Sequence, residues 1–150
     1  MPATPSGTVL AFDFGEKRIG VATGEADLGI AHPLTTIVGE IRDVRFGAIE
    51  KLIAEWQPAQ LVVGLPLHMD GTEHEMTQRC RRFARQLEGR FNLPVALMDE
   101  RLTSAEAEDM LAEQDRRGKQ HKHLIDQVAA QRILQAWLDH QHLLQKSHGQ

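Results

Sequence analysis

Residues 9–15 read Val-Leu-Ala-Phe-Asp-Phe-Gly, an apolar run with the residue types that favour β-strands, and one carboxylate, Asp13, lies inside it. A buried carboxylate without a partner costs on the order of several kcal/mol. Asp13 therefore needs a metal ion, a cation or a set of hydrogen-bond donors, unless the strand ends early and Asp13 lies in a solvated turn. Strand alternation places Asp13 on the same face as Val9 and Ala11, with the other apolar residues of the run opposite.

The composition is ordinary for a globular protein, with 41% hydrophobic and 25% charged residues among 150, enough for one compact domain with a core. No apolar run approaches the roughly 20 residues that cross a bilayer, and residues 1–7 lack the pattern of a signal peptide. The single cysteine, Cys80, excludes an internal disulfide, and we expect a cytoplasmic protein with no membrane partner.

Charge is unevenly distributed along the chain. The net charge of −4 argues against a protein that coats nucleic acid non-specifically, because such affinity comes mostly from neutralising phosphates. Positive charge is nevertheless concentrated in the arginines of residues 79–90 and in the basic run 116–122. Each stretch is either a solvated surface or a phosphate-contacting one, and the sequence leaves both readings open.

Hydrophobic periodicity predicts three strands followed by alternating helices and strands. The expected strands are residues 8–14, 19–23, 28–37 (with Pro33 at an edge or bulge), 60–64 and 94–98. The expected helices are residues 40–56, 72–90, 103–114 (with a capping box from Thr103 to Glu106) and about 124–144.

This order of elements predicts the topology. The first three strands form an antiparallel meander, and the later ones alternate with helices as parallel βαβ units do. We therefore expect a single α/β domain over residues 1–150, with a mixed five-stranded sheet flanked by helices. Its ordered core covers about 8–140, and residues 1–7 and 141–150 are tails.

Further carboxylates stand where they could meet Asp13. Asp99 and Glu100 follow the last predicted strand, at the carboxyl edge where open α/β sheets tend to place their sites. Adjacent strand residues point to opposite faces, so only one of the two is expected to face Asp13, and the spacing does not say which. Asp126 opens the last helix, on the apolar face that also carries Ala130. Taken alone, Asp99 and Glu100 are readily explained as solvated acids near a helix start, whereas the position of Asp126 on the apolar face weakens that explanation for it.

Three converging carboxylates would repel one another unless they shared a cation. Oxygen ligands suit Mg²⁺ or Mn²⁺, and two such ions about 4 Å apart can activate water and stabilise the leaving oxygen in phosphodiester hydrolysis. The pattern therefore predicts a metal-dependent nuclease. A nucleotide loop is excluded, because residues 21–22 are Val-Ala where a Walker A motif needs Lys followed by Ser or Thr.

Four stretches resemble the motifs of the YqgF/RuvX family, in order and at suitable distances. They are FDFG with KRIGVA (residues 12–15 and 17–22), VVGLPL with DGT (62–67 and 70–72), DERLTSAE (99–106) and IDQVAAQRILQ (125–135). The resemblance spans about residues 8–140. It implies an RNase H-like fold and a cytoplasmic nuclease, in a family regarded as Holliday junction resolvases and associated with trimming the 5′ end of the 16S ribosomal RNA precursor.

The resemblance also implies roles for individual residues. The positions that match the family's catalytic, metal-binding acids are Asp13, Glu100 and Asp126. The positions that match its phosphate contacts are Lys17, Arg18 and Arg101.

Several functions remain open at this point. The leading one is a nuclease, dependent on Mg²⁺ or Mn²⁺, that processes pre-16S rRNA in ribosome biogenesis. A Holliday junction resolvase acting on four-way DNA would require a dimer with two symmetric sites. A non-catalytic RNA-binding assembly factor would bind RNA without cutting it. An ATP-binding protein of the sugar-kinase and actin type is disfavoured, because such proteins clamp the nucleotide between two domains. The sequence does not decide between a monomer and a homodimer.

Overall fold

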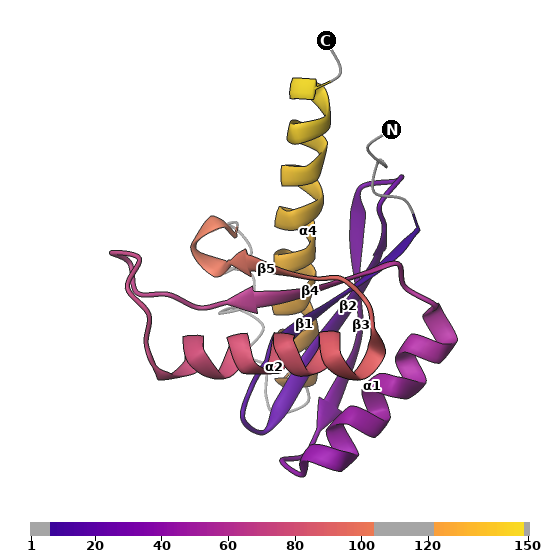
Figure 1. Ribbon diagram of the computed structural model, residues 1–150, viewed down its shortest axis with the longest axis vertical. Helices are drawn as coiled ribbons and strands as arrows, with labels where there is room; N and C mark the ends of the chain where they lie inside the picture. Colours follow the sequence, from indigo (N-terminus) through magenta and orange to yellow (C-terminus); the bar gives the residue numbers. More distant parts are fainter. Residues whose placement is uncertain (1–6, 104–121, 149–150) are drawn as a thin grey trace.

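Five strands form one mixed sheet in the order β3-β2-β1-β4-β5 (Figure 1). The computed structural model describes residues 7–103 and 122–148. The strands are β1 (Thr8–Phe14), β2 (Arg18–Glu25), β3 (Ile30–Val38), β4 (Gln60–Leu65) and β5 (Val95–Asp99). The helices are α1 (Arg42–Trp56), α2 (Glu75–Phe91) and α4 (Lys122–His148), with a short 3₁₀ helix, η1 (Glu100–Leu102), after β5.

The strand directions confirm the predicted topology. β1, β2 and β3 form an antiparallel meander, whereas β1, β4 and β5 run parallel. β1 is the central strand, so its carboxyl end lies beside that of β4 and close to that of β5. This edge of the sheet collects the segments that follow all three parallel strands, which is where open α/β sheets place their sites.

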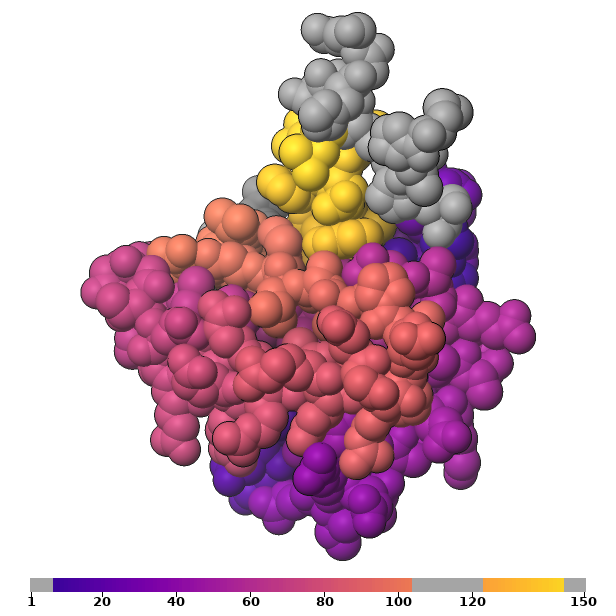
Figure 2. Space-filling view, viewed as in Figure 1, coloured from indigo at the N-terminus to yellow at the C-terminus, as the bar shows by residue number. Residues whose placement is uncertain are grey.

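Helices cover both faces of the sheet. α1 and α2 pack against Leu10 and Phe12 of β1, whereas α4 packs against Val9 and Ala11 on the other face. Figure 1 shows α2 in front of the sheet and α4 behind it, and in Figure 2 the side chains of α2 cover much of the sheet on the face in view. The predicted alternation in β1 is thus confirmed, and it assigns Asp13 to the α4 face.

The third strand tolerates its proline in both of the ways expected. β3 is an edge strand, so the missing N–H of Pro33 removes no bond from the centre of the sheet. The pairing with β2 also shifts at this point: Val21 pairs with Thr35, and Ala22 pairs with Pro33. One extra residue, Leu34, is therefore accommodated in a bulge.

α2 begins later than expected, at Glu75 instead of Thr72. A tight turn occupies the intervening residues: the His68 N–H donates to the Thr72 carbonyl at 2.9 Å. The Asp70 carboxylate accepts from both the N–H and the hydroxyl of Thr72. Because this turn already satisfies the polar groups of residues 68–72, the helix starts only after it.

The last helix is longer than expected. α4 runs from Lys122 to His148, so it continues four residues past Leu144 and into the segment 141–150 expected to be a tail. The physical reason is that no glycine or proline interrupts the sequence between residue 122 and Gly149. Apart from Thr103, the predicted helix over 103–114 lies outside the described part of the chain, as do the basic residues 116–121 and residues 1–6. Within residues 7–103 and 122–148, no helix is long and apolar enough to cross a membrane.

Candidate active site

Asp13 lies near the carboxyl end of the central strand, on the face covered by α4. It is half-buried, and that environment disfavours its charged form. The pKa of Asp13 is raised from 3.8 to about 7, mainly by burial and then by the neighbouring carboxylates of Glu100 and Asp126. The Arg132 guanidinium opposes this shift. The three acids predicted from sequence are thus close enough to influence one another.

Of the two acids at the end of β5, Asp99 and Glu100, it is Glu100 that shares the environment of Asp13. Its carboxyl group lies over β4, where a Cβ added to Gly64 would be 3.3 Å from Glu100 Cδ. Burial raises the pKa of Glu100, whereas the side-chain hydrogen bond from Arg101 lowers the pKa of Asp99. Asp99 accepts bonds from Arg101 at 2.7–3.1 Å, so its charge is already satisfied.

Asp126 is brought to the sheet by a glycine on β2. A Cβ at Gly20 would lie 1.9 Å from the Asp126 carbonyl oxygen, so only glycine allows α4 to approach this closely. Gly20 is also the residue paired with Asp13 in the β1–β2 register. Ala130 of the same helix is fully buried, but the closest approach of the helix to the sheet is made at Gly20. A glycine inside a predicted strand was the sequence signal for this close approach.

The Asp126 carboxylate is paired with a cation of the protein. Arg18 Nε donates to Asp126 Oδ2 at 2.6 Å, and the two side chains are 36% and 20% exposed. Arg18 was expected to contact substrate phosphate, and in this structure it contacts an acid of the site instead. This ion pair therefore has to open before Asp126 takes its expected role as a metal ligand and Arg18 its expected role as a phosphate contact.

The other two expected phosphate contacts differ in their surroundings. Lys17 is exposed in the β1–β2 turn and has no acidic partner within residues 7–103 and 122–148. Arg101 is held by Asp99 and also donates to the Met69 carbonyl at 3.2 Å. Arg101 thus ties the loop after β4 to the segment after β5.

Two arginines that the sequence reading did not single out support the site. Arg132 of α4 opposes the pKa shifts of both buried acids and donates to the Thr103 hydroxyl at 2.9 Å. Arg45 of α1 is buried, and it donates to the carbonyls of Gly15 and Glu16 in the turn after β1. Both are charged residues on or beside a helix face that packs on the sheet, and that position was the signal.

The arginine-rich stretch 79–90 forms part of α2. Within the described residues, Arg81 pairs with Glu73 at 2.6 Å, and the Arg90 guanidinium lies 4.1 Å from the centroid of the Phe46 ring. These contacts favour the reading in which the stretch is a packed and solvated helix face.

The acids fit a divalent cation by their chemistry. Asp13, Glu100 and Asp126 offer only oxygen ligands, as Mg²⁺ and Mn²⁺ prefer. The raised pKa values of Asp13 and Glu100 indicate that the protein does not fully compensate their charge, and a cation would do so. Among the described residues, no three Asp, Glu, His or Cys side chains are close enough to hold one ion together.

Comparison with known proteins places this arrangement in a family. The RuvX profile, described as "Holliday junction resolvase", matches residues 7–140. A relative from Methylobacillus flagellatus is 62% identical over 137 residues, covering 91% of this chain and 94% of the relative. One from Neisseria gonorrhoeae is 58% identical over 139 residues, covering 93% and 92%. Both carry the name "Putative pre-16S rRNA nuclease".

Solved structures share the fold at low sequence identity. The yeast mitochondrial Holliday junction resolvase Ydc2 matches with a TM-score of 0.56 and 13% identity, over 99% of this chain and 84% of its own. RuvC from T. thermophilus, in complex with a Holliday junction substrate, matches with a TM-score of 0.53 and 14% identity, over 91% and 96%. The RNase H-like fold and the nuclease class predicted from the sequence are confirmed. From its match over residues 7–140 and its close relatives, the chain belongs to the RuvX family.

Proposed function

We propose that this protein is a metal-dependent phosphodiester hydrolase that processes the 5′ end of pre-16S rRNA during ribosome biogenesis. The observation that carries the proposal is the environment of Asp13, whose pKa is raised to about 7 by burial and by the neighbouring carboxylates of Glu100 and Asp126. The names of the close relatives support the RNA substrate. Ribosome assembly would place the protein in the cytoplasm, as a single nuclease domain.

The three acids are assigned to hold Mg²⁺ or Mn²⁺. When bound, such ions lower the pKa of a water molecule and stabilise the leaving oxygen of the phosphodiester. The carboxylates orient this chemistry from three different elements: the end of β1, the segment after β5 and the start of α4. Their positions on packed elements support the proposal, because catalytic geometry requires rigid attachment.

Cationic side chains around the acids are assigned to the substrate backbone. Lys17 is the most accessible of them, since it is exposed in the β1–β2 turn. Arg18 is available to a phosphate once Asp126 has exchanged it for a metal ion. Arg101 is anchored by Asp99, which would hold its guanidinium in a fixed orientation toward a phosphate.

A four-way DNA junction is the second candidate substrate. The description of the family profile favours it. Symmetric cleavage of such a junction would require a homodimer, whereas trimming of an RNA end can be performed by a monomer. A non-catalytic RNA-binding role is the third reading, and it predicts binding without cleavage.

The test is cleavage of a pre-16S rRNA fragment and of a four-way DNA junction side by side, in Mn²⁺, in Mg²⁺ and in EDTA. We expect the RNA to be cut at its 5′ end in the presence of metal, and Asp13→Asn to lose this activity while remaining folded. Preferential nicking of the junction would establish the resolvase reading instead. RNA binding without cleavage in either metal, or cleavage by Asp13→Asn at the rate of the parent protein, would refute the proposal.

A further inference from the structure

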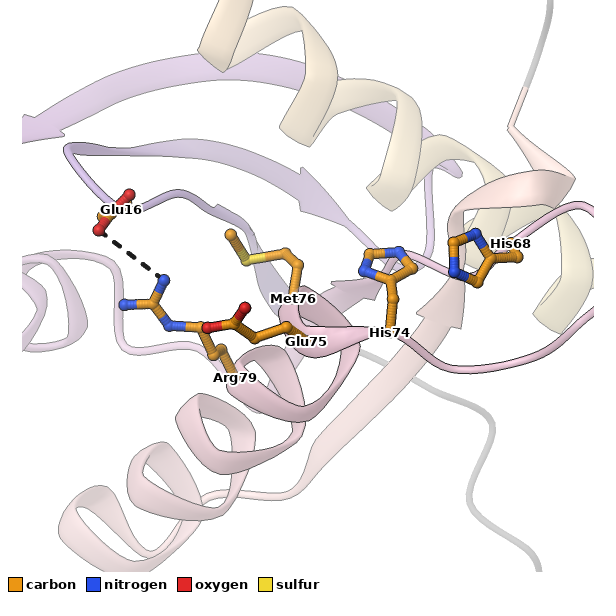
Figure 3. A pocket seen from close by; sticks show the side chains of 6 residues that line it. All are labelled: Glu16, His68, His74, Glu75, Met76 and Arg79. Carbon is orange, nitrogen blue, oxygen red and sulfur yellow. Dashed lines mark ion pairs between the residues drawn. The ribbon is translucent and has the colours of Figure 1, made fainter.

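A hollow of about 540 Å³ lies at the same edge of the sheet as the acids. It is lined by Glu16, His68, His74, Glu75, Met76 and Arg79 (Figure 3). Ligand pockets typically have volumes of about 300–1,000 Å³, so it is large enough for a small planar group. Glu16 follows Asp13 by three residues, which places the hollow next to the active site along the chain. We call it the histidine pocket.

Hydrogen bonds hold the turn that carries His68, and this turn also contacts the segment that carries Glu100. His68 belongs to the hydrogen-bonded turn of residues 68–72, in which the Gly71 N–H donates to the His68 carbonyl at 2.8 Å. The next residue, Met69, accepts a bond from Arg101. Arg101 directly follows Glu100, so a ligand in the pocket would lie beside a segment that also positions the catalytic edge.

Two imidazole rings form one end of the pocket. The ring centroids of His68 and His74 are 4.7 Å apart, and the rings are inclined at 57°. His74 is the N-cap residue of α2, where its backbone N–H donates to the Thr77 hydroxyl at 3.1 Å. Histidine rings of this kind stack on unpaired bases in RNA-binding sites.

The charges of the residues that line the histidine pocket favour a base over a phosphate as its ligand. The lining contains two carboxylates, Glu16 and Glu75, and one guanidinium, Arg79, which already lies 3.9 Å from Glu16 (Figure 3). A phosphate would meet a lining with more negative than positive charge. The amino groups of adenine, cytosine and guanine instead donate hydrogen bonds that a carboxylate accepts.

We propose that the histidine pocket binds one unpaired base of single-stranded RNA, and that it prefers bases with an exocyclic amino group over uracil. This inference rests on the proposed function, whose substrate class it makes narrower. A four-way junction keeps its bases paired, whereas the end of an RNA precursor offers unpaired ones. The pocket therefore favours RNA over the junction as substrate.

Binding can be measured separately from cleavage. Fluorescence anisotropy in EDTA, with labelled oligo(A), oligo(C) and oligo(U), gives the affinity of the full chain for each RNA. We expect His68→Ala to weaken binding of all three by roughly 5- to 150-fold, the range for loss of one stacked base. His68→Phe keeps an aromatic face and is expected to retain most of the affinity.

Removal of the Glu75 carboxylate should change the preference among the three RNAs, an effect that a general loss of stability would not produce. Glu75→Gln is expected to reduce the preference for oligo(A) and oligo(C) over oligo(U). His32→Ala and Glu55→Gln are matched controls, because both residues are exposed and lie outside the pocket. Both controls are expected to bind like the parent protein.

The outcomes separate this inference from the proposed function. If His68→Ala and Glu75→Gln bind every RNA like the controls while the parent protein cuts pre-16S rRNA, the pocket assignment is wrong and the nuclease stands. If binding depends on the pocket as expected but no RNA is cut in Mn²⁺ or Mg²⁺, the nuclease is wrong and the pocket stands. Failure of the parent protein to bind any RNA would overturn both.

Discussion

Arg18 Nε lies 2.6 Å from Asp126 Oδ2, an ion pair that joins β2 to α4 inside the candidate active site. The oxygen that accepts from Arg18 is one of the two that Asp126 can offer to a metal ion. The protein thus neutralises its third acid with its own cation, and a metal ion at the proposed site would have to compete with that cation.

Arg18→Gln is therefore expected to bind Mn²⁺ more tightly than the parent protein. The gain should be roughly two- to five-fold, because a partly exposed ion pair contributes up to about 1 kcal/mol. Isothermal titration calorimetry measures it. Lys17→Gln is the matched control: it should weaken RNA binding and leave Mn²⁺ affinity unchanged. Equal or weaker Mn²⁺ binding by Arg18→Gln would contradict the expectation.

The raised pKa of Asp13 predicts a stability that falls with pH. In the unfolded chain Asp13 loses its proton near pH 3.8, whereas in the folded chain it keeps it up to about pH 7. The folded state binds more protons across this window, so the free energy of unfolding decreases as the pH rises through it, by at most on the order of 4 kcal/mol. The loss is complete above the folded pKa.

Asp13→Asn tests this in EDTA, because asparagine has no charge at any pH. The melting temperature of the variant should exceed that of the parent protein at about pH 8, and the difference should shrink at about pH 4. A difference in melting temperature that does not depend on pH would show that the pKa of Asp13 is not raised in the folded protein.

Gly20→Ala should damage both the fold and the site. The added Cβ would meet the backbone of Asp126 at 1.9 Å, and a backbone atom cannot rotate away as a side chain can. We expect a loss of roughly 3 kcal/mol or more in the free energy of unfolding, measured by urea denaturation. Gly47→Ala is the control. Nothing lies within 4 Å of its added Cβ, and alanine in a helix should stabilise the protein by about 0.5–1 kcal/mol.

Substitutions of the two acids at the end of β5, Asp99 and Glu100, should have unequal effects on cleavage. Glu100→Gln is expected to lower kcat roughly a thousand-fold, because charge stabilisation at a metal site contributes several kcal/mol. It should also raise the melting temperature near neutral pH, since burial raises the pKa of Glu100. Asp99→Asn releases Arg101 and should cost about ten-fold. Steady-state kinetics with both variants compares them, and a larger loss in Asp99→Asn would reverse the assignment.

Alternation in a buried strand predicted the face of Asp13 correctly because a strand has only two faces, and the apolar residues identify both. The same rule could not choose between Asp99 and Glu100. β5 ends at Asp99 and a 3₁₀ turn starts at Glu100, so the two-residue period no longer applies at that point. The resemblance to known motifs selected Glu100, and the burial of its carboxyl group agrees with that choice.

Contacts between distant elements could not be predicted from the sequence. Gly20 lies in the expected strand 19–23, but nothing in the sequence reveals which element crosses above it. Arg45 and Arg132 lie on or beside helix faces that pack on the sheet, but their partners are backbone carbonyls and carboxylates from other segments. Local periodicity predicts where a side chain faces, and only tertiary packing decides what it meets.

The dependence of the site on α4 has a consequence for biosynthesis. Chains emerge from the ribosome N-terminus first, so the whole sheet, with Asp13 and Glu100, is available before Asp126 has been made. Until α4 docks on Gly20, the set of acids is incomplete. On the proposed assignment of the three acids, a nuclease for ribosomal RNA built in this way would be inactive while only its sheet has been made, and would become competent only after its last helix has left the ribosome that made it.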